Sequence, residues 1–86
     1  MWIPIADWLD LVGPEGCSGK LTAYVDSLDL KGYPNTVQLH AHLEVAVTHW
    51  VKDRIMAGDI RVPLPRIEVR LGDDPRVVLI GVVAMD

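Results

Sequence analysis

The 86-residue chain has a single cysteine, Cys17, and few basic side chains. One cysteine excludes an internal disulfide framework and a cysteine-rich zinc site, and it is typical of a reducing compartment. The 8 basic residues are outnumbered by 12 acidic ones, which gives a net charge of −4. Nucleic-acid-binding proteins usually present a basic surface. A surface that neutralises phosphates is therefore not expected.

Long hydrophobic runs are also absent. The longest, "VVLIGVVAM" at 77–85, is too short to cross a bilayer as a helix, which needs about 20 residues. The first residues lack the positive charge of a signal peptide, and Asp7 and Asp10 interrupt their apolar character. The composition predicts a soluble, cytoplasmic protein that makes no membrane contact.

The chain is long enough for one small domain, residues 1–86, and no second core. Half of its residues are hydrophobic, which favours a folded chain over a disordered one. The core of so short a chain is thin, and small domains often gain stability by oligomerising. We therefore expect a homo-oligomer, either a dimer or a tetramer.

The first segment, 2–12, has two competing periods. Its apolar residues alternate along most of the segment, as in a strand, and only Asp7 breaks the pattern. Pro4 at a first turn and Gly13 at the end suit a short helix equally well. Periodicity alone does not decide between the two.

The second segment, 20–33, shows the same conflict. One set of apolar residues is spaced as a helical stripe, with Ser18 as a candidate N-cap and Gly32 just beyond the end. Another set alternates with polar residues from Leu21 to Val25, as in a strand with one solvated face. The local signals leave both structures open.

The remainder of the chain is clearer. Residues 35–58 begin with cap residues and carry a helical face, which predicts a helix of about five to six turns. Alternating residues predict a half-exposed strand at 66–71, and "GDDP" at 72–75 is a tight turn. Residues 76–86 predict a final strand that is apolar on both faces. The face of the helix comprises Leu39, Leu43, Ala46, Val47 and Trp50.

The stretch "GPEGCSGK" at 13–20 resembles a phosphate-binding loop but fails its requirements. Pro14 stands where the first glycine belongs, and Leu21 stands where a magnesium-binding hydroxyl is needed. The stretch is interpreted instead as a glycine-rich hairpin connection, with Cys17 exposed near Lys20.

Metal-binding and catalytic patterns are sparse. His40 with Glu44, and His49 with Asp53, lie one helical turn apart, but no HExxH motif or cysteine completes a zinc site. Carboxylates of the first two segments converge only if those segments pair as strands, and paired acids can hold magnesium for phosphodiester cleavage. These carboxylates are Asp7, Asp10, Asp26 and Asp29. No catalytic residue, metal ligand or cofactor is assigned.

A second apolar face lies opposite the core face of the predicted helix. A second apolar face usually indicates a partner. We predict it to be the partner-binding surface. It comprises Val37, Ala41, Val45, Ile55 and Met56.

The chain resembles the HicB antitoxin family and its short stand-alone relatives. The residues that carry the resemblance are "KLTAYVDSLDLKGYPNT", then a long helix, then the exit "GDIRVPLP". The closing "VVLIGVVAMD" looks like the terminal strand of that family. The resemblance implies an α+β fold, a β-β-β-α-β, partial RNase H-like antiparallel sheet with one long helix on one face. The strand at 66–71 would be an addition near the C-terminus.

This fold would make strands of both ambiguous segments, with "LKGYPNT" at 30–36 as a short third strand. The family binds and blocks a HicA toxin, a small ribonuclease. The resemblance thus implies a non-enzymatic protein-binding module. Many members carry a DNA-binding domain at the C-terminus, and no such sequence follows here, so direct DNA binding is not expected. The alternatives are a phage or mobile-element inhibitor on the same scaffold, and a small metal-dependent hydrolase.

Overall fold

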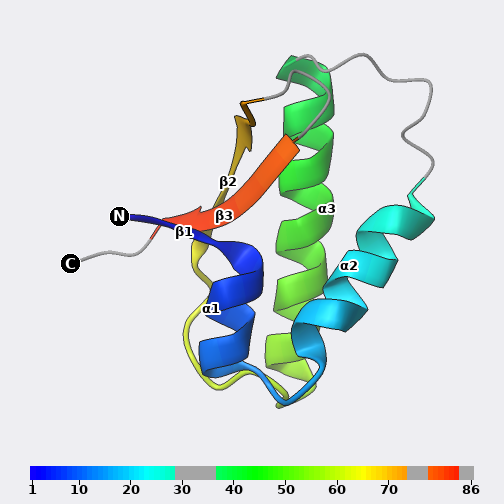
Figure 1. The fold of residues 1–86 in the computed structure, drawn as a ribbon. Helices are drawn as coiled ribbons and strands as arrows, with labels where there is room; N and C mark the ends of the chain where they lie inside the picture. Colours follow the sequence, from blue (N-terminus) through cyan, green and yellow to red (C-terminus); the bar gives the residue numbers. More distant parts are fainter. Residues whose placement is uncertain (29–36, 74–77, 84–86) are drawn as a thin grey trace.

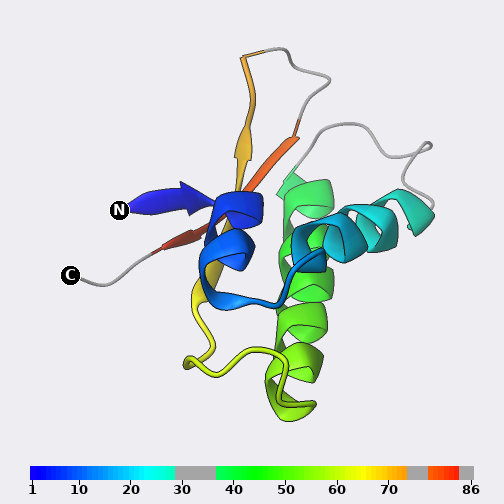
Figure 2. The ribbon, with the colours of Figure 1, turned by 60° about the horizontal axis from the view of Figure 1, so that its bottom comes forward.

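The computed structural model describes residues 1–28, 37–73 and 78–83. These residues form an α+β fold with helices on one side and an antiparallel sheet on the other, as Figures 1 and 2 show. The predicted fold class is confirmed at this level. The elements in chain order are β1 (Trp2–Pro4), α1 (Ile5–Val12), α2 (Cys17–Ser27), α3 (Val37–Met56), β2 (Arg66–Leu71) and β3 (Val78–Val83).

The long helix α3 confirms the helix predicted at 35–58, of which residues 35 and 36 lie outside the described residues. Its core face carries buried side chains at every fourth position: Leu39, Leu43, Val47 and Val51. Each residue of an α-helix advances by about 100°, so residues four apart share a face. The helix ends next to Gly58, where the Asp59 N–H donates to the Arg54 carbonyl at 3.0 Å. That bond satisfies a carbonyl of the last helical turn.

The sheet has the strand order β1-β3-β2, and both pairs are antiparallel. The strands predicted at 66–71 and near the C-terminus are therefore confirmed, although residues 76, 77 and 84–86 of the second are not described. Val82 of β3 lies opposite both Ile3 and Ile67. Ile67 and Val82 are buried in the core against the helices, so alternate residues of these strands lie on the opposite face of the sheet.

The first segment is a short strand followed by a helix. The resemblance implies a strand here, and that expectation is wrong from residue 5 onward. Ile5 and Leu9 are buried one turn apart on α1, so the helical period places both in the core. Pro4 precedes the helix, and the Gly13 N–H donates to the Leu9 carbonyl at 2.8 Å. The helix thus begins after Pro4 and ends before Gly13, the two boundaries that the helical interpretation of the sequence assigns to it.

The second segment is also a helix, α2, and the strand expected from residue 20 onward is wrong for residues 20–27. Cys17 and Leu21 are buried one turn apart, whereas Thr22 and Asp26 remain exposed. The helix begins after Gly16 rather than at the expected cap Ser18. Residues 13–20 thus join two helices and form the start of the second, and no hairpin occurs there.

The order of elements therefore differs from β-β-β-α-β. The described residues contain two additional helices where that order places strands, and the third strand expected at 30–36 lies outside them. The expected packing of a helix on one face of the sheet is present, with α1 and α3 both contacting it. The core between sheet and helices draws on every helix and on β2 and β3.

Candidate protein-binding face

The outward face of α3 exposes apolar side chains from Val37 to Val45 and again at its last residue, Met56, with the exposed polar residues His49, Lys52 and Asp53 between them. Val37 is 84 % exposed, Val45 is 58 % and Met56 is 76 %. Ala41 is also exposed and lies one turn from both valines. Residues four apart in a helix point in directions that differ by only about 40°. Residues 37, 41 and 45 therefore form one stripe on the side away from Leu43 and Val47. Four of the five predicted partner-binding residues therefore reach solvent.

Ile55 does not belong to this stripe. Its side chain is half-buried and packs against the hydrophobic core. It lies one turn beyond Val51, near the point where α3 meets the loop that contains the buried Ile60. The exposed face of α3 is accordingly defined by Val37, Ala41, Val45 and Met56, and its role in binding remains a prediction.

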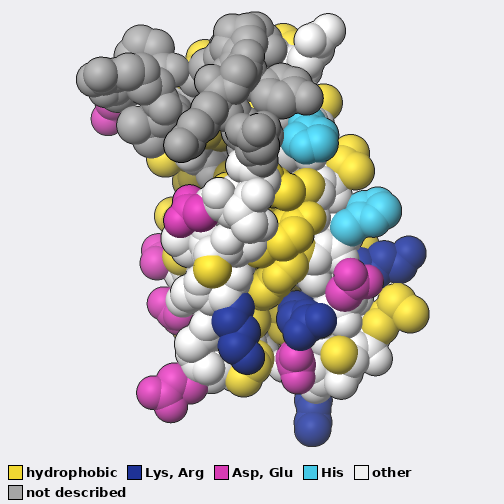
Figure 3. Space-filling model, turned by 90° about the vertical axis from the view of Figure 1, so that its right-hand side faces the viewer, with side chains coloured by type: hydrophobic (Ala, Val, Ile, Leu, Met, Phe, Trp, Pro, Cys, Tyr) yellow, Lys and Arg dark blue, Asp and Glu magenta, His cyan; other side chains and the backbone are white. Residues whose placement is uncertain are grey.

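A polar border accompanies apolar surface on the neighbouring side of the molecule. Figure 3 views the side on which α2 lies in Figure 1, and hydrophobic side chains form a band through the middle of that view. Lysine, arginine, aspartate and glutamate side chains lie on both flanks of the band. An apolar centre with a polar rim is the usual anatomy of a protein–protein interface.

Arg54 near the C-terminal end of α3 is held by contacts within the chain. Its guanidinium carbon lies 5.9 Å from the centroid of the Trp50 ring, and its Nη1 lies 3.4 Å from Oδ2 of Asp59. The side chains of the ion pair are both partly exposed, so the pair contributes little to stability. These contacts hold the cation near the C-terminal end of α3.

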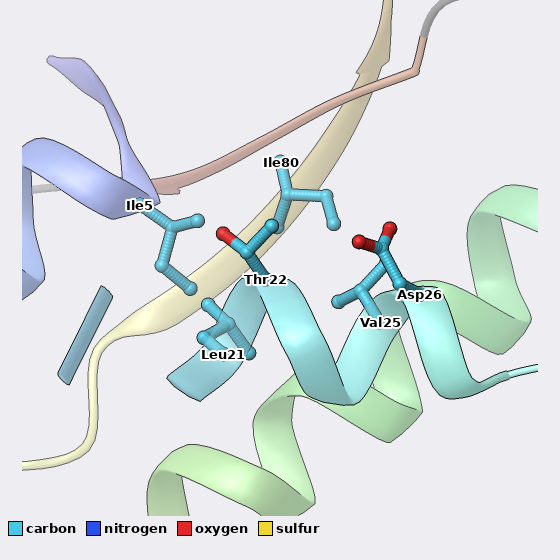
Figure 4. Close-up of a pocket in the computed structure, with 6 residues that line it drawn as sticks. All are labelled: Ile5, Leu21, Thr22, Val25, Asp26 and Ile80. Atoms are coloured by element: carbon cyan, nitrogen blue, oxygen red, sulfur yellow. The ribbon is translucent and has the colours of Figure 1, made fainter. Parts of the chain in front are cut away.

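A shallow pocket of about 130 Å³ lies between α1, α2 and β3. Figure 4 shows apolar side chains around it, with Thr22 and Asp26 as its polar residues. Its volume is well below the roughly 300–1,000 Å³ of typical small-molecule sites. The Thr22 hydroxyl donates to the Ser18 carbonyl at 3.0 Å, and no reactive side chain accompanies it. The apolar lining of the pocket consists of Ile5, Leu21, Val25 and Ile80.

The carboxylates of the first two segments do not converge as paired strands would require. Asp7 and Asp10 lie on α1 and Asp26 lies on α2, while Asp29 is outside the described residues. Oδ1 of Asp10 accepts a hydrogen bond from the Ser18 hydroxyl at 2.9 Å, which links the two helices. Within residues 1–28, 37–73 and 78–83, no three His, Cys, Asp or Glu side chains are placed to hold a metal ion.

Cys17 is buried rather than exposed, which corrects the expectation of a thiol in an open loop. Only 2 % of its surface is accessible, because the first turn of α2 directs the side chain into the core. Burial raises the pKa of the Cys17 thiol, and the Asp59 carboxylate raises it further, while Lys20 and Arg54 act in the opposite direction. A protonated, enclosed thiol is a poor nucleophile.

Sequence reasoning missed a cluster on the sheet face that points away from the helices. The Trp2 indole N–H donates to the Glu68 carbonyl at 3.4 Å, and the Arg70 guanidinium carbon lies 5.1 Å from the centroid of the Trp2 ring. Nε of Arg70 also donates to Oε1 of Glu68 at 2.8 Å. The indole lies directly over Gly81, where a Cβ atom would collide with it. No local signal predicts contacts between residues so far apart in the chain.

No family model, curated protein or solved structure matches the chain. None of the helices in the described part of the chain is long and apolar enough to cross a membrane.

Proposed function

We propose that the chain is a non-enzymatic protein-binding module whose contact surface is the exposed face of α3. The observation that supports this proposal is the stripe of Val37, Ala41 and Val45 on the side of the helix that faces away from the core, with Met56 exposed beyond Lys52 at the helix end. Exposed apolar side chains aligned on one helix face are typical of surfaces that bind a partner. Isolated exposed side chains would not support this inference.

The binding mode is a helix laid into an apolar groove of the partner. Such helices use anchors about one turn apart, which is the spacing of Val37, Ala41 and Val45. Full burial of a valine or methionine side chain contributes about 1.5–3 kcal/mol. A few such anchors supply affinity, and exposed charged side chains beside them on α3, such as Glu44 and Lys52, supply specificity.

The proposed partner is a HicA-like ribonuclease toxin, as the resemblance to HicB antitoxins implies. The helix of this chain is more apolar at its start than the acidic and alanine-rich helix of that family. The proposed contact therefore departs from the usual interface of the family and uses an apolar groove on the toxin. The resemblance rests on residues 20–65, of which residues 20–27 form a helix and not the strand that the resemblance implies. A phage or mobile-element inhibitor that uses the same face against another protein is the second candidate. The module is also proposed to form a homo-oligomer.

Titration calorimetry with a HicA-like ribonuclease from the same genome tests this function. We expect the unmodified chain to bind, and Val45→Glu to bind at least tenfold more weakly because a charge enters an apolar contact. Ala23→Glu adds the same charge at an exposed position of α2 and is expected to leave affinity unchanged. Equal affinities for both variants and the unmodified chain would contradict the role of the α3 face.

A further inference from the structure

β2 is an edge strand of the sheet, and no strand in the described part of the chain pairs with its outer side. The direction of its backbone groups follows from the Trp2 contact. Trp2 belongs to β1, on the far side of β3, yet its indole N–H reaches the Glu68 carbonyl. The Glu68 carbonyl therefore points toward β3. Because backbone groups alternate along a strand, those of Ile67, Val69 and Leu71 point outward.

This edge has only part of the usual protection against pairing with another chain. Protected edge strands are very short, carry charged side chains (above all lysine) or proline, or contain a bulge. The charged side chains of β2, at Arg66, Glu68 and Arg70, are of both signs and can therefore pair with each other across two copies. β2 runs from Arg66 to Leu71 with no lysine or proline inside it, and its pairing with β3 is regular over all six residues. Leu71 at its end is 58 % exposed. The strand thus offers outward hydrogen-bonding groups and an uncovered apolar side chain.

Like charges and proline disfavour several registers if two copies of β2 pair antiparallel. A two-fold axis at Glu68 or at Arg70 places identical charges directly opposite each other, which is destabilising. An axis at Ile67 places Pro65 at an outward position, where its missing N–H removes a hydrogen bond.

An axis at Val69 satisfies both conditions. Glu68 of each copy then lies opposite Arg70 of the other, and Leu71 lies opposite Ile67. Each residue with an outward backbone retains its N–H group. The two cross-strand ion pairs would join the Glu68–Arg70 contact already present within each strand.

We propose that β2 pairs antiparallel with β2 of a second copy, with the two-fold axis at Val69. The dimer would have one continuous sheet of six strands, three from each copy. The proposal rests on the self-association proposed above. It places that self-association on the edge of β2, a surface separate from the exposed face of α3. A failure here leaves partner binding through α3 standing.

Two charge reversals and their mixture test this register. In Glu68→Arg, the introduced guanidinium of each copy would face Arg70 of the other. In Arg70→Glu, two carboxylates would face each other. Sedimentation equilibrium of the unmodified chain should give twice its 9.5 kDa mass, and each variant alone should dissociate at least tenfold more readily. An equimolar mixture of the two variants should restore the dimer, because every cross-strand pair is then of opposite charge.

Two controls separate the interface from the fold. Both reversals break the ion pair within the strand, and Arg70→Glu also loses the Trp2 contact, so circular dichroism must show that each monomer is folded. Arg61→Glu reverses an exposed charge outside β2 and should leave the dimer intact. If a reversal unfolds the monomer, Leu71→Lys provides a second test, because Leu71 is largely exposed and an edge lysine opposes pairing.

A monomeric unmodified chain at concentrations of several hundred micromolar would overturn the proposal. So would dimers of undiminished stability in both reversals, or in Leu71→Lys, or a mixture no more dimeric than its components. A dimer that persists in these variants but dissociates in Val45→Glu would place self-association on α3 instead.

Discussion

At the scale of single residues, the sheet face away from the helices is organised by Trp2. Its indole lies over Gly81 of β3, contacts the Arg70 guanidinium and donates to the Glu68 carbonyl. These contacts fasten the three-residue strand β1 across β3 to β2. A strand this short forms few backbone hydrogen bonds, so we infer that the indole contributes much of its attachment.

Gly81→Ala tests the close approach of this indole. The added Cβ would collide with the ring, and we expect a loss of about 1–3 kcal/mol in the free energy of unfolding, measured in urea. In the background of Trp2→Ala the collision disappears, and Gly81→Ala should cost much less there. Equal costs in both backgrounds would show that the indole does not lie against Gly81.

Cys17 gives stability a predictable pH dependence. The unfolded thiol loses its proton near the usual pKa of about 8.5, whereas the folded thiol, with its raised pKa, holds the proton to higher pH. The stabilisation of the folded chain that comes from keeping this thiol protonated is therefore fully present below the unfolded pKa. It is lost as pH rises from the unfolded pKa through the folded pKa. Between pH 7 and 10, the unmodified chain should lose more unfolding free energy than Cys17→Ala. Parallel pH profiles would contradict the burial of the thiol.

At the scale of elements, predictability followed the strength of the local pattern. Helix α3 and strand β2 have one dominant period each, and β3 is a short run that is apolar on both faces, so the sequence predicts all three. Gly58 and the prolines before β2 separate the helix from the strands. The first two segments carry both periods at once. Only tertiary packing of Ile5, Leu9 and Leu21 decides for the helix, and that packing is not a local property.

The candidate site was predictable to a similar degree. Helical geometry alone places Val37, Ala41 and Val45 away from the core, and the structure exposes all three. Ile55 escaped that reasoning because it packs against the hydrophobic core, to which the buried Ile60 beyond the helix also belongs. The Trp2 cluster was not predictable, because it depends on the strand order of the sheet.

Substitutions of Gly16 and Gly19 test whether residues 13–27 form a helix or a hairpin. Gly19 lies inside α2 with open space around it, so Gly19→Ala should stabilise the fold by about 0.5–1 kcal/mol. Gly16 precedes the helix with a φ of 83°, so Gly16→Ala should destabilise it by about 1–2 kcal/mol. Thermal unfolding of the two variants shows whether each substitution raises or lowers the stability of the fold. Destabilisation by Gly19→Ala would contradict helix α2.

At the scale of the whole molecule, two surfaces have separate proposed roles. The exposed face of α3 is proposed to bind a partner protein, and the outer edge of β2 is proposed to bind a second copy. α3 packs against the core face of the sheet, and its apolar stripe points away from that contact. A β2-paired dimer would therefore leave the stripe of each copy available, and one dimer would bind two partners.

The most direct test of the central claim is RNA cleavage by a HicA-like ribonuclease in the presence of increasing amounts of the chain. The account predicts that the unmodified chain and Ala23→Glu suppress cleavage fully near one chain per ribonuclease. Val45→Glu should require at least tenfold more protein for the same effect. Full suppression by Val45→Glu at the same ratio as the unmodified chain, or no suppression by any of the three proteins, would contradict the account.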